Sequence, residues 1–249
     1  MRMLIPALIA ASLAAFTSCT GGPAPTDPGA AIAASGRPAS DKALDAQRRG
    51  PEILAFADVR PGWKIGDLMQ GAGYFTRLWV SAAGADGRVY AWSPPEFIEA
   101  KKALYGDSLD QLVREYPTHV VPLRMAFDDL AFPEPLDMVF QSQNYHDLHM
   151  ARFPGDQAAK LNAAVFRALK SGGTYIIVDH VAGAGDAAAP DRVHRGDPSL
   201  MLREVEAAGF RFVGESDVLR NPDDDHTKHV FDPAIRGRTD QVIYKFRKP

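Results

Sequence analysis

The sequence predicts an α/β fold, a doubly wound and mostly parallel sheet with helices on both faces. Short apolar segments typical of strands alternate with segments of helical periodicity, which is the pattern of βαβ units. Pairs such as Pro61-Gly62 and Gly172-Gly173 separate these segments. Of the 249 residues, 46% are hydrophobic and 24% charged, which excludes wholesale disorder, a collagen-like repeat and a polytopic membrane protein.

The folded part is expected to span residues 41–249, which is long enough for one sizeable core. It begins with a helical segment at 41–59, which the turn at Pro61-Gly62 ends. Strands are expected in order at 63–69, 88–92, 119–123, 136–141, 174–178, 210–214 and 241–246. Between them, helices are expected at 74–83, 95–116, 157–169 and 198–208, and glycines follow the first, third and fourth of these.

The first forty residues carry export signals. Arg2 precedes an apolar run at 4–16 that is too short to span a bilayer and fits a secretory signal peptide. The four residues 16–19 resemble a bacterial lipobox that ends at Cys19, so 1–19 is interpreted as a signal peptide with a lipobox and the protein as an exported lipoprotein of the cell envelope. A plain signal peptide with Cys19 as a bystander is the alternative. Residues 20–40 are rich in Gly, Pro, Ala and Ser and are expected to form a flexible linker.

Charge and cysteine content narrow the classes of partner. The formal net charge is −3, which argues against a nucleic-acid binder because such proteins carry a basic face. The single cysteine excludes an internal disulfide framework and a Cys-rich metal site. The expected partners are a small-molecule substrate and, through a lipid at Cys19 alone, a membrane.

An acidic residue and closely spaced glycines follow the first strand, in the segment from Asp67 to Gly73. Glycines let the backbone approach a ligand, and an acid at a strand end can bind a polar group of that ligand. This pattern is expected for a nucleoside cofactor, although glycine turns also end many strands that bind nothing.

On these residues the chain resembles the class I S-adenosylmethionine-dependent methyltransferases. Asp67-x-Met69-x-Gly71-x-Gly73 resembles their loop of an acid and three glycines, with Met69 in the place of the first glycine. More narrowly, the chain resembles a group of exported predicted methyltransferases in 144–147, 178–180, 194–195, 207–210 and the tail at 224–233. The resemblance implies a seven-stranded Rossmann-like sheet with an antiparallel last strand, S-adenosylmethionine as cofactor, and methyl transfer to an unidentified small acceptor.

The resemblance also implies a set of cofactor-binding residues. Ser93 stands where most members carry an acid that pairs with the ribose, and Glu96 lies three residues further on. Asp128 stands where such enzymes often bind the adenine amine. The implied cofactor-binding residues are Asp67, Gly71, Gly73, Ser93, Glu96, Asp128 and Asn144.

Candidate catalytic residues follow the fourth and fifth strands, whose ends meet at one sheet edge. His146 is a candidate general base, oriented by Asp179 or Asp147, with Tyr145 beside it. The alternative is that His146 and Tyr145 are loop residues bonded to the backbone. Arg195 could bind an anionic group of a ligand, but taken alone it is interpreted as one partner of a surface salt bridge.

The seven histidines raise the possibility of a metal site, because His146 and His149, and likewise His226 and His229, are three residues apart. Neither pair matches a strong zinc motif, so no metal ligand is assigned. Two other functions remain open. One is an envelope binding protein that keeps the methyltransferase fold without catalysis, and the other is a metal-dependent hydrolase.

Overall fold

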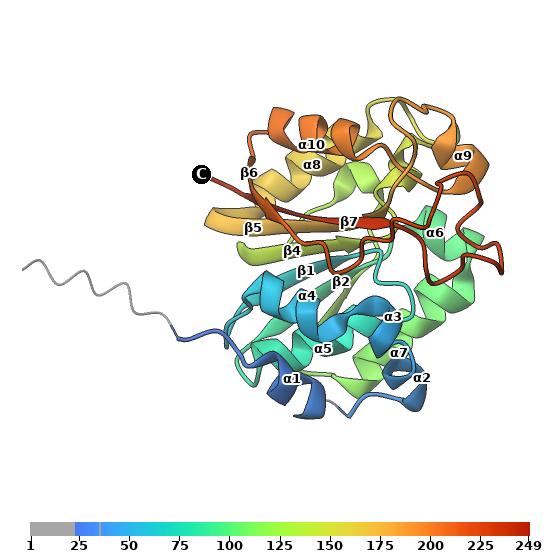
Figure 1. Cartoon of the computed structure of the whole chain (residues 1–249). Coiled ribbons are helices and arrows are strands. Elements are labelled where there is room, and N and C mark those ends of the chain that lie inside the picture. The colour runs from blue at the N-terminus through green and yellow to red at the C-terminus, as the bar shows by residue number, and fades with distance from the viewer. Residues whose placement is uncertain (1–22, 35) are drawn as a thin grey trace, which may run out of the picture.

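The computed structural model, which describes residues 23–34 and 36–249, contains a seven-stranded sheet with helices on both faces (Figure 1). The strand order is β3-β2-β1-β4-β5-β7-β6, and β7 runs antiparallel to β5 and β6. Both the doubly wound, mostly parallel α/β fold and the antiparallel last strand are confirmed. The predicted signal peptide and Cys19 lie outside the described residues.

The elements follow the expected order along the chain. The strands are β1 (Lys64–Leu68), β2 (Arg88–Trp92), β3 (Val120–Leu123), β4 (Leu136–Ser142), β5 (Leu169–His180), β6 (Arg211–Glu215) and β7 (Gln241–Arg247). The α-helices are α1 (Pro28–Ala34), α2 (Ala39–Lys42), α3 (Asp45–Arg48), α4 (Gly50–Ala57), α5 (Tyr74–Ala83), α6 (Pro95–Ala100), α7 (Ser108–Glu115), α8 (Gln157–Ala168), α9 (Ala189–Val193) and α10 (Pro198–Ala207). Three short turns are the π-helical η1 (Ala103–Asp107) and the 3-10 helices η2 (Phe127–Asp129) and η3 (His146–His149).

Two apolar cores lie on opposite faces of the sheet, because successive side chains of a strand point to opposite sides. Val89 and Phe140 pack with α4, α5 and α7, which lie below the sheet in Figure 1. Val139 and Ile177 pack with α8 and α10, which lie above it. This arrangement brings the carboxyl ends of β1, β2 and β4 to one edge of the sheet, the edge where open α/β sheets bind ligands.

The described part of the expected linker differs from the prediction. Helix α1 packs against α4 and α5, and its Ala31 is buried. The backbone N–H of Thr26 donates to the carbonyl of Val59 at 2.8 Å, and the Thr26 hydroxyl donates to Ala82 at 2.7 Å. An alanine-rich helix buries little surface per residue, but its small side chains let it lie close to its neighbours. Composition alone therefore did not reveal this helix.

Two helices expected to be continuous are interrupted. Residues 41–59 hold the end of α2 and the two short helices α3 and α4, and Arg49, with a left-handed φ of 51°, separates α3 from α4. Residues 95–116 divide into α6, η1 and α7, with the break at Lys101. The start of α7 reaches the loop after β1, where the hydroxyl of Ser108 donates to the carbonyl of Gly71 at 2.7 Å.

A buried ion pair holds the long segment between β6 and β7 against the sheet. The guanidinium of Arg195 donates to both carboxylate oxygens of Asp224, at 2.8 and 3.1 Å, and to the carbonyls of Val181 and Lys228. The salt bridge favoured for Arg195 exists, but it is buried and not on the surface. None of the described helices is both long and apolar enough to cross a membrane.

Candidate functional site

A cavity of about 290 Å³ opens at the carboxyl edge of the sheet, between the loops that follow β1 and β4. The loop after β1 and η1 line one end, and η3 with the segment after α9 lines the other. Arg48 from α3 and Phe231 from the segment before β7 border the cavity from opposite ends of the chain. The predicted residues that line it are Asp67, Gly71, Asn144, His146 and Asp147, and Gln70, Tyr105, His180 and His194 line it as well.

The loop after β1 keeps a left-handed backbone at each of the three glycine positions of the acid-and-glycine motif. The φ angle is 49° at Met69, 58° at Gly71 and 84° at Gly73. A methionine in this conformation is strained, because its Cβ crowds the following carbonyl. The loop therefore has the backbone of a glycine loop even where the glycine is missing.

Gly71 and Gly73 have different surroundings. A Cβ at Gly71 would meet only the Leu104 side chain, at 3.9 Å, so the space beside this backbone is open. A Cβ at Gly73 would lie 2.7 Å from the Leu112 side chain. Gly73 therefore allows close packing of α7, and no ligand space adjoins the place where its Cβ would be.

Asp67 is a buried carboxyl at the end of β1. Burial raises its pKa to about 7, and the hydrogen bond that it accepts from the Thr76 hydroxyl at 2.6 Å opposes this rise. The neighbouring Asn144 donates to the carbonyl of Met69 at 3.3 Å, while its side-chain oxygen is buried and accepts no hydrogen bond from a described residue. These two side chains offer acceptor atoms to a cationic ligand group.

The side of this loop that faces β2 is closed by the chain itself. Ser93 is fully buried, and its hydroxyl donates to Gln70 Oε1 at 2.6 Å. Gln70 Nε2 in turn lies 3.4 Å from the carbonyl of Tyr105. Beyond Ser93, Trp92 donates to the carbonyl of Met125 and packs edge-on against Phe127. In this conformation Ser93 does not reach the cavity.

The opposite end of the cavity is built from histidines. His146 Nδ1 lies 2.8 Å from Asp179 Oδ1, and the His146 backbone N–H donates to Asp179 Oδ2 at 2.7 Å. Burial lowers the pKa of His146, but the charge and the hydrogen bond of Asp179 outweigh it, so the pKa lies above 6.5. Burial lowers the pKa of the neighbouring His180 to about 3, which keeps that ring neutral.

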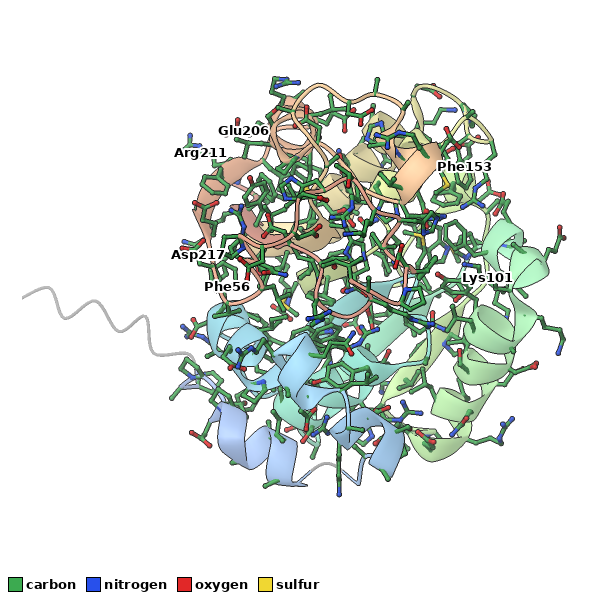
Figure 2. All side chains as sticks on the ribbon, turned by 45° about the vertical axis from the view of Figure 1, so that its right-hand side comes forward. Phe56, Lys101, Phe153, Glu206, Arg211 and Asp217 are labelled. Atoms are coloured by element: carbon green, nitrogen blue, oxygen red, sulfur yellow. The ribbon has the colours of Figure 1, made fainter. Side chains whose placement is uncertain are left out.

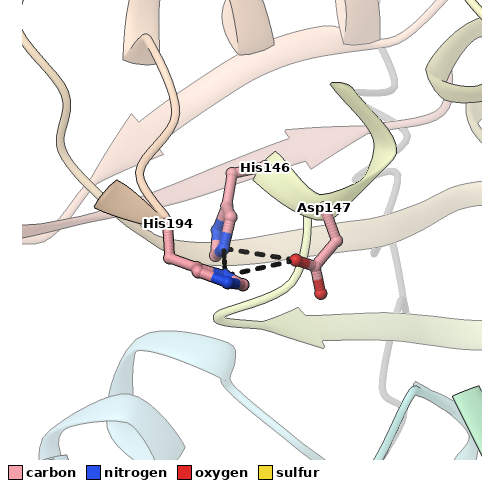
Figure 3. A group of neighbouring side chains, drawn as sticks. All are labelled: His146, Asp147 and His194. Carbon is pink, nitrogen blue, oxygen red and sulfur yellow. Dashed lines mark hydrogen bonds and ion pairs between the residues drawn. The ribbon is translucent and has the colours of Figure 1, made fainter. Parts of the chain in front are cut away.

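Two further side chains converge on His146 (Figure 3). His194 Nδ1 lies 3.3 Å from His146 Nε2, and Asp147 Oδ1 lies 3.5 Å from that nitrogen and 3.6 Å from His194 Nδ1. His194 adopts a left-handed φ of 56°, which turns its ring toward η3. The sequence pairs of histidines three residues apart did not indicate this group, because His194 is distant in the chain.

Three predicted site residues lie elsewhere. The Tyr145 hydroxyl is buried, donates to Glu204 Oε2 at 3.0 Å and accepts from Asn162 Nδ2 at 2.8 Å, away from His146 and His194. Asp128 is exposed on η2, 3.5 Å from the Lys160 ammonium. Glu96 lines an adjoining depression of about 330 Å³ that shares Lys101, Asp147 and His194 with the cavity, and Lys101 and Phe153 of its lining are labelled in Figure 2. Strand-end position alone did not reveal which way these side chains point.

Comparisons with known proteins agree with this architecture. No protein-family model and no curated protein matches the chain. It is similar to the structure of an S-adenosylmethionine-dependent methyltransferase from Aquifex aeolicus, with 18% identity and a TM-score of 0.55 over 89% of this chain and 98% of that one. The 1,6-didemethyltoxoflavin-N1-methyltransferase of Burkholderia thailandensis, solved with S-adenosylhomocysteine, gives 16% identity and a TM-score of 0.51 over 84% of this chain and 81% of its own.

A third similar structure is that of the cyclase SpnF, with 16% identity and a TM-score of 0.56 over 85% of this chain and 81% of that one. At such identities the likeness concerns the fold, and one fold supports several chemistries. The chain has the fold of the class I S-adenosylmethionine-dependent methyltransferases.

Proposed function

We propose that this protein is an S-adenosylmethionine-dependent methyltransferase with a small-molecule acceptor. The observation that supports this function best is one cavity that joins the left-handed loop after β1 to the His146–Asp179 pair. The loop offers backbone to a cofactor, and the pair offers a proton acceptor to a substrate. The shared fold with solved methyltransferases adds to this support.

The residues at the loop fit the amino-acid end of this cofactor. Its ammonium group is a donor with a positive charge, and the Asp67 carboxyl and the unsatisfied Asn144 oxygen are acceptors on lining residues. The open space beside Gly71 allows close approach to the backbone. A ligand here would satisfy buried polar atoms that otherwise cost free energy.

The end of the cavity near β2, where Ser93 and Gln70 lie, is called the nucleoside end. Its residues can contact the nucleoside of the cofactor only after a side chain moves. Gln70 accepts the hydrogen bond of Ser93, the expected ribose contact, and Ser93 is fully buried. We propose that Gln70 turns away when the cofactor enters and leaves the Ser93 hydroxyl for the ribose. Asp128 and Glu96, which lie outside the cavity, take no part in this proposal.

When bound, the cofactor supplies a methyl group on a positively charged sulfur. The carboxylate of Asp179 can only accept a hydrogen bond, so His146 Nδ1 carries a proton and Nε2 of the neutral ring has a lone pair. Nε2 faces the cavity, where it can take a proton from the acceptor. Asp179 then stabilises the imidazolium, in keeping with the raised pKa of His146.

Calorimetric titration of the purified protein with S-adenosylmethionine and with S-adenosylhomocysteine tests this function directly. We expect both compounds to bind, because both carry the amino-acid and nucleoside groups. Absence of heat at millimolar ligand, in a sample whose circular dichroism shows the folded sheet, would remove the proposal.

A binding protein that keeps the fold without catalysis is the second candidate. The observation in its favour is the closed nucleoside end, where Ser93, Gln70 and Trp92 bond to the chain itself. Methylated product in a screen of small acceptors would eliminate this candidate.

We also propose, from the lipobox resemblance alone, that the protein is exported and anchored by a lipid at Cys19. Mass spectrometry of the native protein should find Cys19 as a lipid-bearing first residue. An unmodified first residue at another position would refute the anchor.

A further inference from the structure

The cluster of His146, Asp147 and His194 has the spacing of ligands around one metal ion. The three atoms that face one another lie 3.3, 3.5 and 3.6 Å apart. Ligands held at ~2.1 Å from one ion at tetrahedral angles are about 3.4 Å apart, which is the spacing expected for zinc with nitrogen and oxygen ligands. Because all three separations match, one ion fits at a similar distance from each atom.

Hydrogen bonding inside the cluster does not account for the position of Asp147. His146 and His194 can share one long hydrogen bond, but 3.5 and 3.6 Å are too long for a bond to Asp147. Asp147 Oδ1 is buried and has no hydrogen-bond partner among the described residues. Its nearest guanidinium nitrogen, Nη2 of Arg152, is 3.9 Å away. A buried acceptor of this kind costs free energy unless a ligand occupies it.

Asp179 supplies the outer contact that metal-binding histidines usually have. It accepts a hydrogen bond from His146 Nδ1, which fixes the ring and directs Nε2 at the cluster. His194 has a left-handed backbone with a φ of 56°, a conformation that histidine tolerates better than most residues.

We propose that His146 Nε2, Asp147 Oδ1 and His194 Nδ1 bind one divalent transition metal ion, with zinc as the best match to the ligand set and its spacing. Two imidazoles and one carboxylate suit zinc or ferrous iron, and the tetrahedral spacing favours zinc. Both Asp147 and His194 line the cavity, so a fourth position faces the substrate space. Such an open position is typical of catalytic and not of structural zinc sites.

The inference concerns the acceptor end of the cavity and does not depend on methyl transfer. A bound ion would use the lone pair of His146 Nε2 and would bind an oxygen or nitrogen atom of the acceptor. The ion would then lower the pKa of that acceptor atom. The acceptor class would be small molecules with a metal-binding hydroxyl or carboxylate.

The test is a metal titration of the purified protein after dialysis against a chelator. We expect one equivalent of zinc, by calorimetry and by elemental analysis after gel filtration, with a dissociation constant of about 1 µM or below. Cobalt in place of zinc should give the visible absorption of a tetrahedral ion. Binding of less than about a tenth of an equivalent of zinc per protein, at a free zinc concentration of about ten times that dissociation constant, would overturn the proposal.

Variants identify the ligands. We expect Asp147→Asn and His194→Asn each to weaken zinc binding at least about 100-fold, and Asp179→Asn about 10–100-fold through the loss of the outer contact. Asparagine at position 194 tolerates the left-handed backbone, so the loop should keep its shape. Circular dichroism and thermal unfolding verify folding. Unchanged zinc affinity in folded Asp147→Asn and His194→Asn proteins would contradict the site.

Two control variants show whether the loss of zinc affinity is specific to the proposed ligands. His149→Ala removes a nearby histidine that lies 3.0 Å from Glu204, and His119→Ala removes a histidine just before β3, at the opposite edge of the sheet. Both should keep wild-type zinc affinity, and a loss equal to that of His194→Asn would show non-specific binding. The titration with S-adenosylmethionine is separate, so failure of the metal site and failure of the cofactor site are distinguishable.

Discussion

The two ends of the cavity differ in whether their buried polar side chains have hydrogen-bond partners. At the end near β2, Ser93 and Gln70 bond to each other, and Trp92 bonds to the backbone. At the other end, Asp147 Oδ1 remains without a hydrogen-bond partner among the described residues. Buried polar atoms in folded proteins are nearly always paired, so an unpaired one indicates where a ligand belongs. The comparison teaches that the histidine end is built for a ligand, whereas the nucleoside end must open first.

The largest expected effect comes from the histidine end. In metal-free protein, where the lone pair of His146 Nε2 can accept a proton, His146→Ala should lower methyl transfer about 10²–10⁴-fold, the usual loss when a general base is removed. Binding of S-adenosylhomocysteine should stay within about 2-fold, because His146 faces the acceptor and not the loop after β1. Steady-state kinetics and calorimetry measure the two quantities. A parallel loss of cofactor affinity would show that the two ends do not act separately.

The pH dependence of stability tests the loop end through Asp67. Its pKa is about 7 in the folded protein and 3.8 as the ordinary value, so between these pH values the folded state holds a proton that the unfolded state has lost. The free energy of unfolding therefore falls as the pH rises from about 4 to 7, by at most about 4 kcal/mol. Below the ordinary value both states are protonated, and above the folded value both are ionised.

Asp67→Asn should remove this contribution and still accept the Thr76 hydrogen bond. Urea unfolding of both proteins from pH 4 to 8.5 measures the difference between their free energies, in which the other groups cancel. We expect the variant to gain stability relative to the wild type as the pH rises. A difference that is flat with pH would mean that Asp67 is ionised throughout.

Gly73→Ala separates packing from ligand contact in the loop. The added Cβ would approach the Leu112 side chain at 2.7 Å, so overpacking should destabilise the protein by about 1–3 kcal/mol beyond backbone strain. Gly62→Ala is the matched control, because Gly62 has the same φ of 84° with no atom within 4 Å of the added carbon. Thermal unfolding compares the two, and equal losses would show that the Leu112 contact is unimportant.

The smallest expected effect concerns the closure of the nucleoside end. Gln70→Ala removes the acceptor that holds Ser93, so S-adenosylmethionine should bind about 3–10-fold more tightly, the worth of one hydrogen bond. Gln111→Ala on the exposed face of α7 serves as the control. Weaker binding by the Gln70 variant would mean that this side chain contacts the cofactor itself.

The fold could be predicted from sequence because strand periodicity, glycine breaks and the motif from Asp67 to Gly73 are local signals. The placement of Asp67, Gly71, Asn144 and His146 around one cavity also followed, since parallel strands end at one edge. Helix α1 was missed because the burial of alanine depends on its neighbours and not on its own hydrophobicity.

The rest of the site depended on contacts between distant parts of the chain. His194 reaches His146 only through the left-handed turn after α9. Tyr145 follows a strand end as predicted, yet its hydroxyl turns to Glu204 on α10. Neither direction is encoded in nearby residues, because each depends on packing among helices that the sequence does not place.

Trp92 gives the molecule an internal optical reporter. Its indole is buried between the backbone of Met125 and the ring of Phe127, directly beside Ser93. Trp79 lies on the other face of the sheet, packed against Phe140. Opening of the nucleoside end would change the environment of Trp92 and leave that of Trp79 intact. The fluorescence of a protein that carries both Trp63→Phe and Trp79→Phe, and so keeps Trp92 alone, should therefore follow cofactor entry in real time and stay constant when zinc binds at the histidines.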